Sequence, residues 1–182
     1  AMRARGPDGA GLWCEEGEGW AVGLGHRRLA IRDLSDAGHQ PMLSPCGRYA
    51  LSYNGELYEE ARLRRRLANY GVKLKGHSDT ELLLYLLIHE GVSALEHVNG
   101  VFAFAFWDQT KAQLTLARDR FGVKPLFVCE REGGVGFASE VKGLLSAGLT
   151  PFQLNLQAHA DLLALTYTPG PKSAVEGVEQ LK

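Results

Sequence analysis

The chain has 182 residues, of which 45% are hydrophobic and 23% are charged, and its formal net charge at pH 7 is -1. This length and composition are typical of one globular domain, with or without a short tail, and exclude a disordered chain. Nucleic acids and anionic membranes select proteins with a basic excess, so the balanced charge disfavours both as partners. The one basic cluster, at residues 62–66, lies in a helical pattern and is interpreted as a solvated helix face.

The cysteines and the apolar runs indicate the compartment. Cys14, Cys46 and Cys129 are widely spaced and form no C-x-x-C pair. An odd number in this arrangement predicts neither a disulfide framework nor a metal site, and a reducing cytoplasm fits best. The N-terminus lacks the apolar core of a signal peptide, and the most apolar run, residues 101–107, is too short to span a bilayer. We therefore expect a soluble cytoplasmic protein.

The first part of the chain predicts two strands and then a helix. Short strands are expected at residues 20–24 and 49–53. Residues 57–70 have the spacing of an amphipathic helix, and Gly71 is a favoured residue just beyond a helix C-terminus.

A buried helix and a two-faced strand are predicted next. Ser78 and Glu81 have the spacing of a capping box, and the apolar run at residues 82–88 is typical of a buried helix. Residues 101–107 alternate large phenylalanines with small alanines. Such a strand can present bulky side chains to one layer and allow another layer to pack closely on its opposite face.

The rest of the chain predicts shorter elements, at residues 114–117, 125–128, 135–138, 140–145 and 155–165. Connections this short cannot all be parallel crossovers, so we predict an α+β domain of antiparallel strands layered with helices. We place this domain at residues 1–150, with several residues of latitude at its edge. Residues 151–182, which contain the Thr-Pro-Gly-Pro break, are interpreted as a linker to a further domain.

Two motifs in the first part of the chain have local explanations. Residues 5–9, R-G-P-D-G, form a turn signal, because proline fixes φ and glycine tolerates positive φ. Residues 25–29, G-H-R-R-L, follow a strand, so their arginines could be a polar strand end. Alternatively, one arginine points inward and forms a fork that binds a carboxylate through two parallel hydrogen bonds.

Asn54-Gly55 follows a predicted strand directly and is the strongest short-range signal for a two-residue hairpin turn. The same pair has a second possible use, because a side-chain amide and an adjacent glycine N–H can converge on a developing oxyanion. The local sequence favours the turn.

The S-D-T-E stretch is sufficiently explained as a helix start, in which Asp79 is stabilised by the positive end of the helix dipole. Its functional interpretation is a carboxylate placed to receive an ammonium group. His26, His39 and His77 show no metal spacing and are interpreted as structural. Residues 118–126 carry charges on both sides of a turn and are interpreted as a salt-linked loop.

Taken in chain order, these stretches resemble the N-terminal glutaminase domain of the asparagine synthetase family, whose members are class II glutamine amidotransferases. The resemblance runs from residue 5 to about residue 145 and rests on R-G-P-D-G, G-H-R-R-L-A-I, Q-P-M, Y-N-G-E-L-Y, S-D-T-E, F-A-F-A-F-W-D, A-R-D-R-F-G-V-K-P-L-F and F-A-S-E-V-K-G-L-L. Each motif alone is weak, but eight in the same order and with similar spacing are specific. Residues 167–181 resemble the family's passage into its synthetase domain.

The resemblance implies the N-terminal-nucleophile hydrolase fold, an αββα four-layer sandwich of antiparallel sheets, and the hydrolysis of glutamine to glutamate and ammonia. Carried over by position, Arg28 would hold the α-carboxylate of glutamine and Asp79 its α-amino group. Asn54 and Gly55 would be catalytic, because they would offer a side-chain amide and a backbone N–H to the oxyanion. The same pocket would be lined by Leu29, Ala30, Ile31 and Glu56.

The start of the chain departs from the family pattern. The family's nucleophile is an N-terminal cysteine whose own free amine serves as the base. We expect the segment with that cysteine and the first strand to be missing, and Ala4 stands where the pattern has histidine. Cys14, Cys46 and Cys129 do not occupy the matching position. The chain is therefore expected to hydrolyse glutamine negligibly.

Two functions follow from the resemblance. The first is a glutaminase domain that releases ammonia for amide synthesis, as in asparagine biosynthesis, by a ligase whose synthetase domain acts in cis or in trans. The second is a catalytically dead scaffold or amino-acid-binding domain that supports a synthetase partner. Retention of Arg28, Asn54, Gly55 and Asp79 favours the glutaminase domain. ATP and magnesium are expected to bind in the synthetase domain, and no cofactor is expected in this domain. If the first strand is missing, a sheet edge is exposed, which predicts a homodimer or aggregation.

Overall fold

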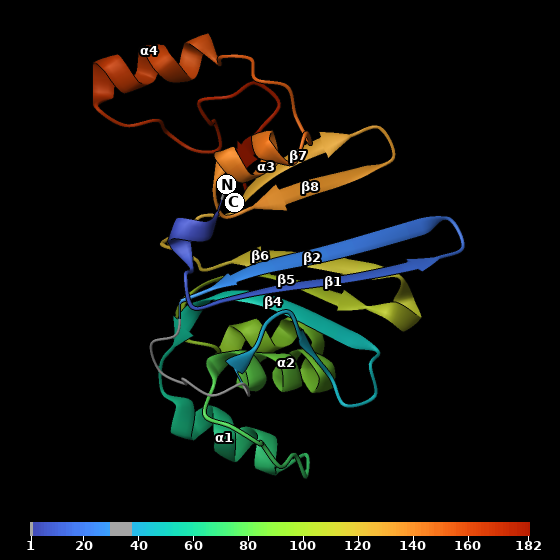
Figure 1. The fold of residues 1–182 in the computed structure, drawn as a ribbon. Helices are drawn as coiled ribbons and strands as arrows, with labels where there is room; N and C mark the ends of the chain where they lie inside the picture. Colours follow the sequence, from blue (N-terminus) through green and yellow to red (C-terminus); the bar gives the residue numbers. More distant parts are fainter. Residues whose placement is uncertain (1, 30–37) are drawn as a thin grey trace. The chain divides into compact units, whose positions relative to one another are not determined.

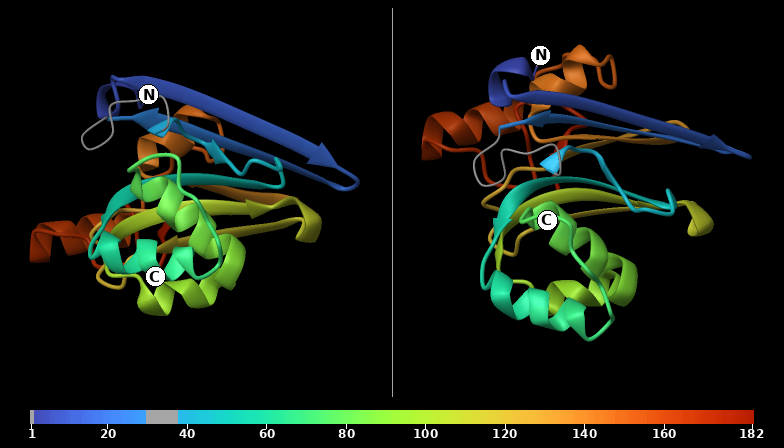
Figure 2. Two further views of the ribbon diagram at one scale, coloured as in Figure 1. Left: turned by 90° about the horizontal axis from the view of Figure 1, so that it is seen from below. Right: turned by 60° about the horizontal axis from the view of Figure 1, so that its bottom comes forward.

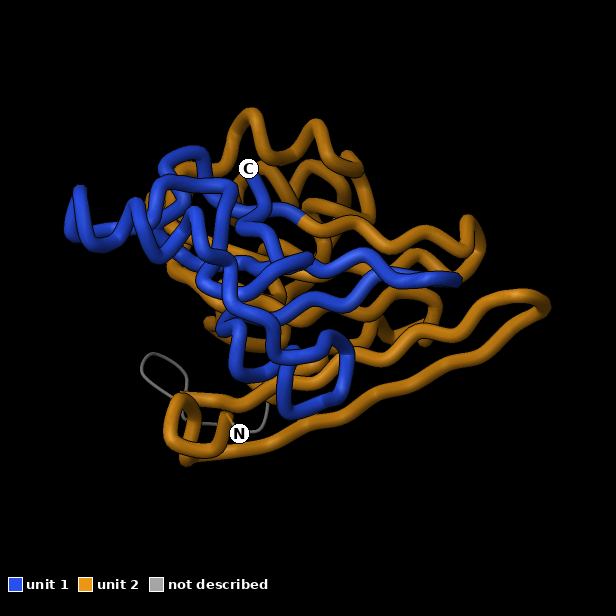
Figure 3. Tube along the Cα trace, turned by 90° about the horizontal axis from the view of Figure 1, so that it is seen from above, with its two compact units in different colours: residues 1, 117–182 blue, residues 2–116 orange. Residues whose placement is uncertain are grey.

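The computed structural model describes residues 2–29 and 38–182. The chain divides into two compact units, an N-terminal unit at residues 2–116 and a C-terminal unit at residues 117–182 (Figure 3). Each unit is described by itself. No helix among the described residues is long and apolar enough to cross a membrane.

The N-terminal unit holds a hairpin, a four-stranded sheet and two α-helices (Figure 1). Its elements are η1 (Arg3–Arg5), β1 (Gly9–Gly17), β2 (Trp20–Arg28), β3 (Met42–Leu43), β4 (Tyr49–Leu57), α1 (Glu60–Ala68), α2 (Asp79–Glu90), η3 (Gly91–His97), β5 (Gly100–Asp108), η4 (Gln109–Lys111) and β6 (Gln113–Arg118), the last of which crosses the boundary between the units. The sheet has the order β3-β4-β5-β6, and β1 pairs with β2.

The sheet of this unit is covered on both faces, by the β1–β2 hairpin on one and by α1 and α2 on the other (Figures 1 and 2). Ser52 Oγ lies 3.2 Å from His26 Nδ1, so the even-numbered residues of β4 face the hairpin. The odd-numbered Leu51, Tyr53 and Leu57 face the helices and are buried. A strand covered on both faces must be apolar on both, which explains the buried run of β5.

The prediction that large and small residues of β5 face opposite layers is confirmed. Phe102 pairs with Gly55 and Phe104 with Tyr53, so the phenylalanines share the face of β4 that meets the helices. Ala103 pairs with Asn54 on the hairpin side.

The prediction that Asn54-Gly55 forms a hairpin turn is wrong. Both residues lie within β4, where they pair with Ala103 and Phe102 of β5. The partner strand comes more than forty residues later, and this long-range pairing overrides the local turn preference. For the same reason α1 begins at Glu60, later than the predicted residue 57, because β4 continues to Leu57.

The predicted start of the buried helix is confirmed. Ser78 caps α2, and its Oγ accepts a hydrogen bond from Glu81 N at 3.2 Å. The Glu81 carboxylate accepts hydrogen bonds from Lys75 N and Gly76 N, both at 2.8 Å, in the segment that precedes α2. Glu81 therefore holds the segment that leads into the helix in a fixed conformation.

The C-terminal unit contains a three-stranded sheet and two helices, β7 (Phe127–Arg131), β8 (Gly134–Ala138), α3 (Val141–Ser146), α4 (Leu156–Leu165) and β9 (Glu179–Gln180). Cys129, Leu144, Val175 and Val178 form its buried core. The segment interpreted as a linker thus supplies part of this core and the strand β9, which pairs with β7. The position of the domain edge near residue 150 stays a prediction.

The charged loop that precedes β7 is organised by one carboxylate. Asp119 is buried and accepts hydrogen bonds from Phe121 N at 3.2 Å, Val123 N at 2.9 Å and Lys124 N at 2.9 Å. Because a carboxylate can satisfy several backbone donors at once, the loop has a fixed shape.

Candidate functional site

The structure brings Asn54, Gly55 and Glu56 close to Asp79. These three residues lie in the last part of β4, and Leu57 N, directly after them, donates a hydrogen bond of 2.9 Å to Asp79 Oδ2. Asp79 is the first residue of α2 and is buried. Residues that are separated by more than twenty positions in sequence therefore meet where β4 ends and α2 begins.

The edge of β4 presents backbone N–H groups on the side away from β5. Tyr53 N donates to Gln40 Oε1 at 2.6 Å, and Leu57 N donates to Asp79 Oδ2. N–H groups alternate in direction along a strand, so the Gly55 N–H points to this same edge, between the two hydrogen bonds. Strand β3 pairs with Ala50 and Leu51, before this stretch begins.

Gly55 is required by the close approach of β5. A Cβ added at this position would lie 2.8 Å from Phe102 Cα and would also overlap the carbonyl oxygen of Val101. Both neighbours are backbone atoms and cannot move aside as a flexible side chain could. Gly55 therefore allows β4 and β5 to lie close together. It is part of a strand and does not adopt the turn conformation that the local sequence favours.

Arg28 approaches from the opposite layer. It lies at the end of β2 and shares a face of that strand with His26, which contacts Ser52 of β4. Ser52 in turn shares its face with Asn54. Strands β2 and β4 end on the same side of the unit (Figure 1), so the face of β2 with Arg28 and the face of β4 with Asn54 are turned toward each other at that end.

Gly38 makes room for the guanidinium of Arg28. A Cβ on Gly38 would lie 3.0 Å from Arg28 Cζ and would overlap Nη2. Of the other predicted pocket residues, Leu29 is exposed and Glu56 is half-buried. Ala30 and Ile31 lie outside the described residues.

His26 is a neutral group near the Arg28 guanidinium. Burial, then the nearby charges of His39 and Arg28, lower the pKa of His26 from 6.5 to about 4. The imidazole is therefore uncharged at neutral pH. The positive charge on this face of the hairpin is left to Arg28, which suits the binding of a carboxylate.

Gln40 joins the two elements of the site and was not assigned a role from sequence. Its side chain is buried, and its Nε2 donates to Thr80 Oγ1 at 3.1 Å while Oε1 accepts from Tyr53 N. The Q-P-M motif contains this residue, but a glutamine before a proline carries no local signal for a bridge between a strand and a helix.

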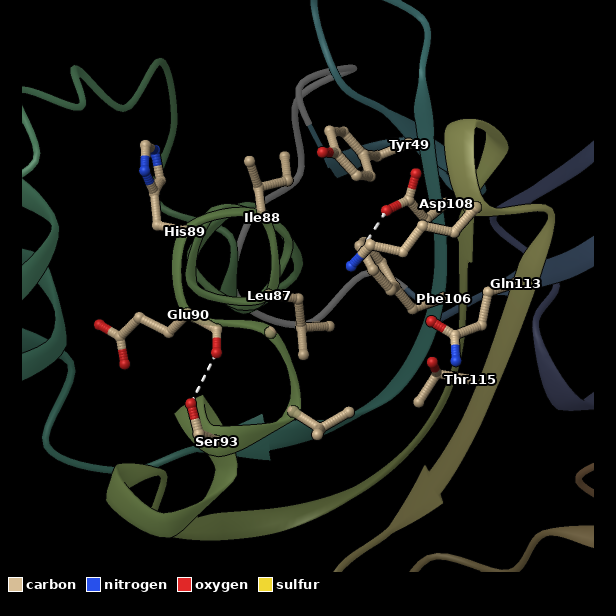
Figure 4. Close-up of a pocket in the computed structure, with 13 residues that line it drawn as sticks. Tyr49, Leu87, Ile88, His89, Glu90, Ser93, Phe106, Asp108, Gln113 and Thr115 are labelled. Carbon is tan, nitrogen blue, oxygen red and sulfur yellow. Dashed lines mark hydrogen bonds and ion pairs between the residues drawn. The ribbon is translucent and has the colours of Figure 1, made fainter.

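A cavity of about 480 Å³ lies at the opposite end of the same sheet (Figure 4). It is lined by residues from the start of β4, the ends of α2 and β5, and β6, among them Tyr49, Leu87, Phe106, Asp108 and Thr115. Its buried carboxylate, Asp108, is already paired with Arg48 at 3.2 Å and Lys111 at 3.7 Å. The predicted pocket residues that the structure describes, Arg28, Leu29, Asn54, Gly55, Glu56 and Asp79, do not line this cavity.

The three cysteines lie in three different parts of the described chain. Cys14 pairs with Gly23 in the hairpin and is exposed, and Cys46 is exposed in the turn between β3 and β4. A hydrogen bond with Ser44, at 3.3 Å, lowers the pKa of the Cys46 thiol. Cys129 is buried in the core of the C-terminal unit. The described residues contain no cluster of three or more side chains that could hold a metal ion.

The sequence was compared with models of protein families, and the model described as a glutamine amidotransferase domain matches residues 1–182. The chain belongs to this family. The predicted resemblance to the glutaminase part of asparagine synthetase-like proteins is thereby confirmed.

Two curated relatives are similar to this glutamine amidotransferase domain. Amidase chry2 of Gibberella zeae is 42% identical over 147 residues, which is 81% of the chain and 22% of the relative. Asparagine synthetase [glutamine-hydrolyzing] 3 of Bacillus subtilis is 41% identical over 147 residues, which is 80% of the chain and 23% of the relative. The domain thus spans less than a quarter of the length of either protein.

A solved structure with a similar fold is the glutamine phosphoribosylpyrophosphate amidotransferase of Bacillus subtilis, in complex with ADP and GMP. The TM-score is 0.59 and the sequence identity 27%, over 69% of the domain and 29% of that chain. This likeness confirms the predicted α+β class with antiparallel sheets and the N-terminal-nucleophile hydrolase type of fold.

Proposed function

We propose that this glutamine amidotransferase domain binds L-glutamine between the end of β2 and the end of β4. The observation that carries the proposal is the hydrogen bond from Leu57 N to Asp79 Oδ2, which brings Asp79 next to the stretch of β4 that contains Gly55. Strand β2, whose last residue is Arg28, ends on the same side of the unit as β4 (Figure 1). A free amino acid is a zwitterion and needs a donor fork for its carboxylate and an acceptor for its ammonium group. Arg28 and Asp79 would provide these.

The reaction that this arrangement supports is attack on the side-chain amide of glutamine. Negative charge then develops on the amide oxygen, and the Gly55 N–H and the Asn54 side-chain amide would donate hydrogen bonds to it. Removing one such donor typically slows a reaction of this kind by about 10²- to 10³-fold. Glu56 and Leu29 would border the substrate, as would Ala30 and Ile31 by position in the family pattern. The attacking thiol is supplied in the family by an N-terminal cysteine.

In the whole protein we propose that the ammonia serves amide synthesis by a synthetase domain, which would also bind ATP and magnesium. The names of the similar asparagine synthetases support this role. A cytoplasmic location agrees with the three free thiols. A homodimer is a further part of the proposal, and light scattering that shows a strictly monomeric species would contradict it.

The second candidate is a domain that binds the amino acid without turnover. Within the N-terminal unit, Cys14 lies in the β1–β2 hairpin and Cys46 in the turn before β4, and neither is at the end of β4, which favours this candidate for the 182-residue polypeptide. In an ammonia-release assay we expect this polypeptide to stay at background. Turnover comparable with that of an intact glutaminase would contradict the second candidate.

Binding of L-glutamine by two charge-removing variants tests the proposed function. Arg28→Met and Asp79→Asn should each weaken the Kd measured by calorimetry by about 10- to 100-fold, because a hydrogen bond to a charged group contributes about 1.5–3 kcal/mol. Arg62→Met on the exposed face of α1 is the matched control and should leave the Kd unchanged. Equal losses in all three variants would exclude a specific role for Arg28 and Asp79.

Gly38→Ala tests the orientation of the guanidinium. The new methyl group would meet only the far end of the Arg28 side chain, which can turn away, so we expect little change in the melting temperature. The displaced fork should weaken L-glutamine binding by roughly 10-fold, the loss of about 1.4 kcal/mol. Gly25→Ala in β2, where a methyl group meets open space, is the control. An unaltered Kd in Gly38→Ala would show that Arg28 does not bind the substrate in this orientation.

A further inference from the structure

Gln40 is the polar side chain that connects the two elements of the proposed site. It is 8% exposed, and both ends of its amide are bonded. Oε1 accepts from Tyr53 N at 2.6 Å on the edge of β4, and Nε2 donates to Thr80 Oγ1 at 3.1 Å in the first turn of α2. Because the amide plane is rigid, these two hydrogen bonds fix the spacing between the strand edge and the helix.

The two hydrogen bonds of Gln40 form a bridge between β4 and α2, and this bridge ends next to the proposed binding groups on both elements. Tyr53 is two residues before Gly55 on the same edge of β4, and Thr80 is next to Asp79. The hydrogen bond from Leu57 N to Asp79 Oδ2 forms a second connection on the other side of Gly55. The Gly55 N–H and the Asp79 carboxylate are thus held between two connections, one direct and one through Gln40.

We infer that Gln40 and Thr80 are positioning residues for glutamine recognition: their hydrogen bond sets the distance from the oxyanion donor Gly55 to the ammonium acceptor Asp79. The inference rests on the proposed function. In L-glutamine the side-chain carbonyl and the α-amino group are separated by a fixed number of bonds. A site that holds both must keep its own two groups at a matching separation, so the bridge would favour an amino acid over an analogue that lacks the α-amino group.

The test is the ratio of two dissociation constants, that of 4-carbamoylbutanoate, which lacks the α-amino group, divided by that of L-glutamine. Calorimetry on the 182-residue chain would measure both. We expect the unaltered chain to favour L-glutamine by about 10-fold or more. In Thr80→Val, which keeps the side-chain shape and removes Oγ1, the ratio should fall to about threefold or less. Gln40→Leu should have the same effect, and the double variant should add little, because both changes break one bridge.

Two further comparisons separate positioning from stability. Thr80→Ser keeps the hydroxyl and should retain the ratio of the unaltered chain. Ser173→Ala removes a buried hydroxyl that bonds to Val175 in the C-terminal unit, and it should leave the ratio unchanged even if it lowers the melting temperature. The ratio does not depend on the fraction of folded protein, so a destabilised variant remains informative.

The outcomes distinguish this inference from the function on which it rests. If the unaltered chain discriminates and Thr80→Val and Gln40→Leu still do so equally well, the bridge has no positioning role, while the proposed function stands. If the unaltered chain binds neither compound, both fail. A fall in the ratio in Thr80→Val with recovery in Thr80→Ser is the result that the inference predicts.

Discussion

Replacement of Gly55 by alanine is expected to destabilise the N-terminal unit by about 3 kcal/mol, because overpacking against a fixed backbone costs roughly 1–3 kcal/mol and sometimes more. The added Cβ would lie 2.8 Å from Phe102 Cα, so β4 and β5 would have to separate. That separation would also move the Gly55 N–H, and L-glutamine binding should be lost with the stability. All three tryptophans lie in this unit, so urea unfolding followed by tryptophan fluorescence reports on it directly.

The matched control for this prediction is Gly25→Ala in β2. An alanine Cβ there meets open space, and its backbone is extended as in any strand. Its unfolding midpoint should match that of the unaltered chain or lie slightly higher, since alanine restricts the unfolded chain more than glycine does. Equal stability of Gly55→Ala and Gly25→Ala would contradict the close approach of β4 and β5 at this position.

The second large effect is a loss of stability in acid that depends on His26. Its pKa is lowered to about 4 in the folded protein from 6.5 in the unfolded chain. Between these values the unfolded state binds the extra proton, so stability is fully present above pH 6.5 and falls as the pH drops toward 4. The size of this contribution is about 2–3 kcal/mol, because one pKa unit corresponds to about 1.4 kcal/mol and the group is partly solvated.

The variant His26→Asn keeps a hydrogen-bonding group near Ser52 and cannot be protonated. It should reduce the change in unfolding free energy between pH 6.5 and 4 relative to the unaltered chain, whatever its stability at pH 7. Ser93→Ala, which removes an exposed hydroxyl that does not titrate, serves as the control and should keep the original pH dependence. The same slope in His26→Asn as in the unaltered chain would show that His26 is not held neutral in the folded state.

The elements that could be predicted from sequence are those whose signals are local. The cap formed by Ser78 is a contact between residues three positions apart, and the alternation of large and small residues in β5 is visible in a few letters. The order of the motifs along the chain was sufficient to indicate the family, since it requires no knowledge of their contacts in space.

The features that sequence reasoning missed depend on contacts between distant segments. Asn54-Gly55 has the local composition of a turn, and only its pairing with β5 makes it part of a strand. Gln40 contacts residues 13 and 40 positions away, and nothing beside it in the sequence indicates this bridge. In the same way, β9 joins a sheet whose other strands lie some forty residues earlier, so the segment that contains it has the composition of a linker.

The central claim is that glutamine binds where β4 meets α2, and a two-dimensional NMR titration of the 15N-labelled chain tests it most directly. We predict that the backbone amide signals of Gly55 and Asp79 shift together as L-glutamine is added, with one Kd of the order of 1 mM. The signals of Gln113 and Thr115, which line the cavity at the other end of the sheet, should stay in place. Shifts that gather around that cavity, or no shift at Gly55 and Asp79 up to roughly 10 mM, would contradict the claim.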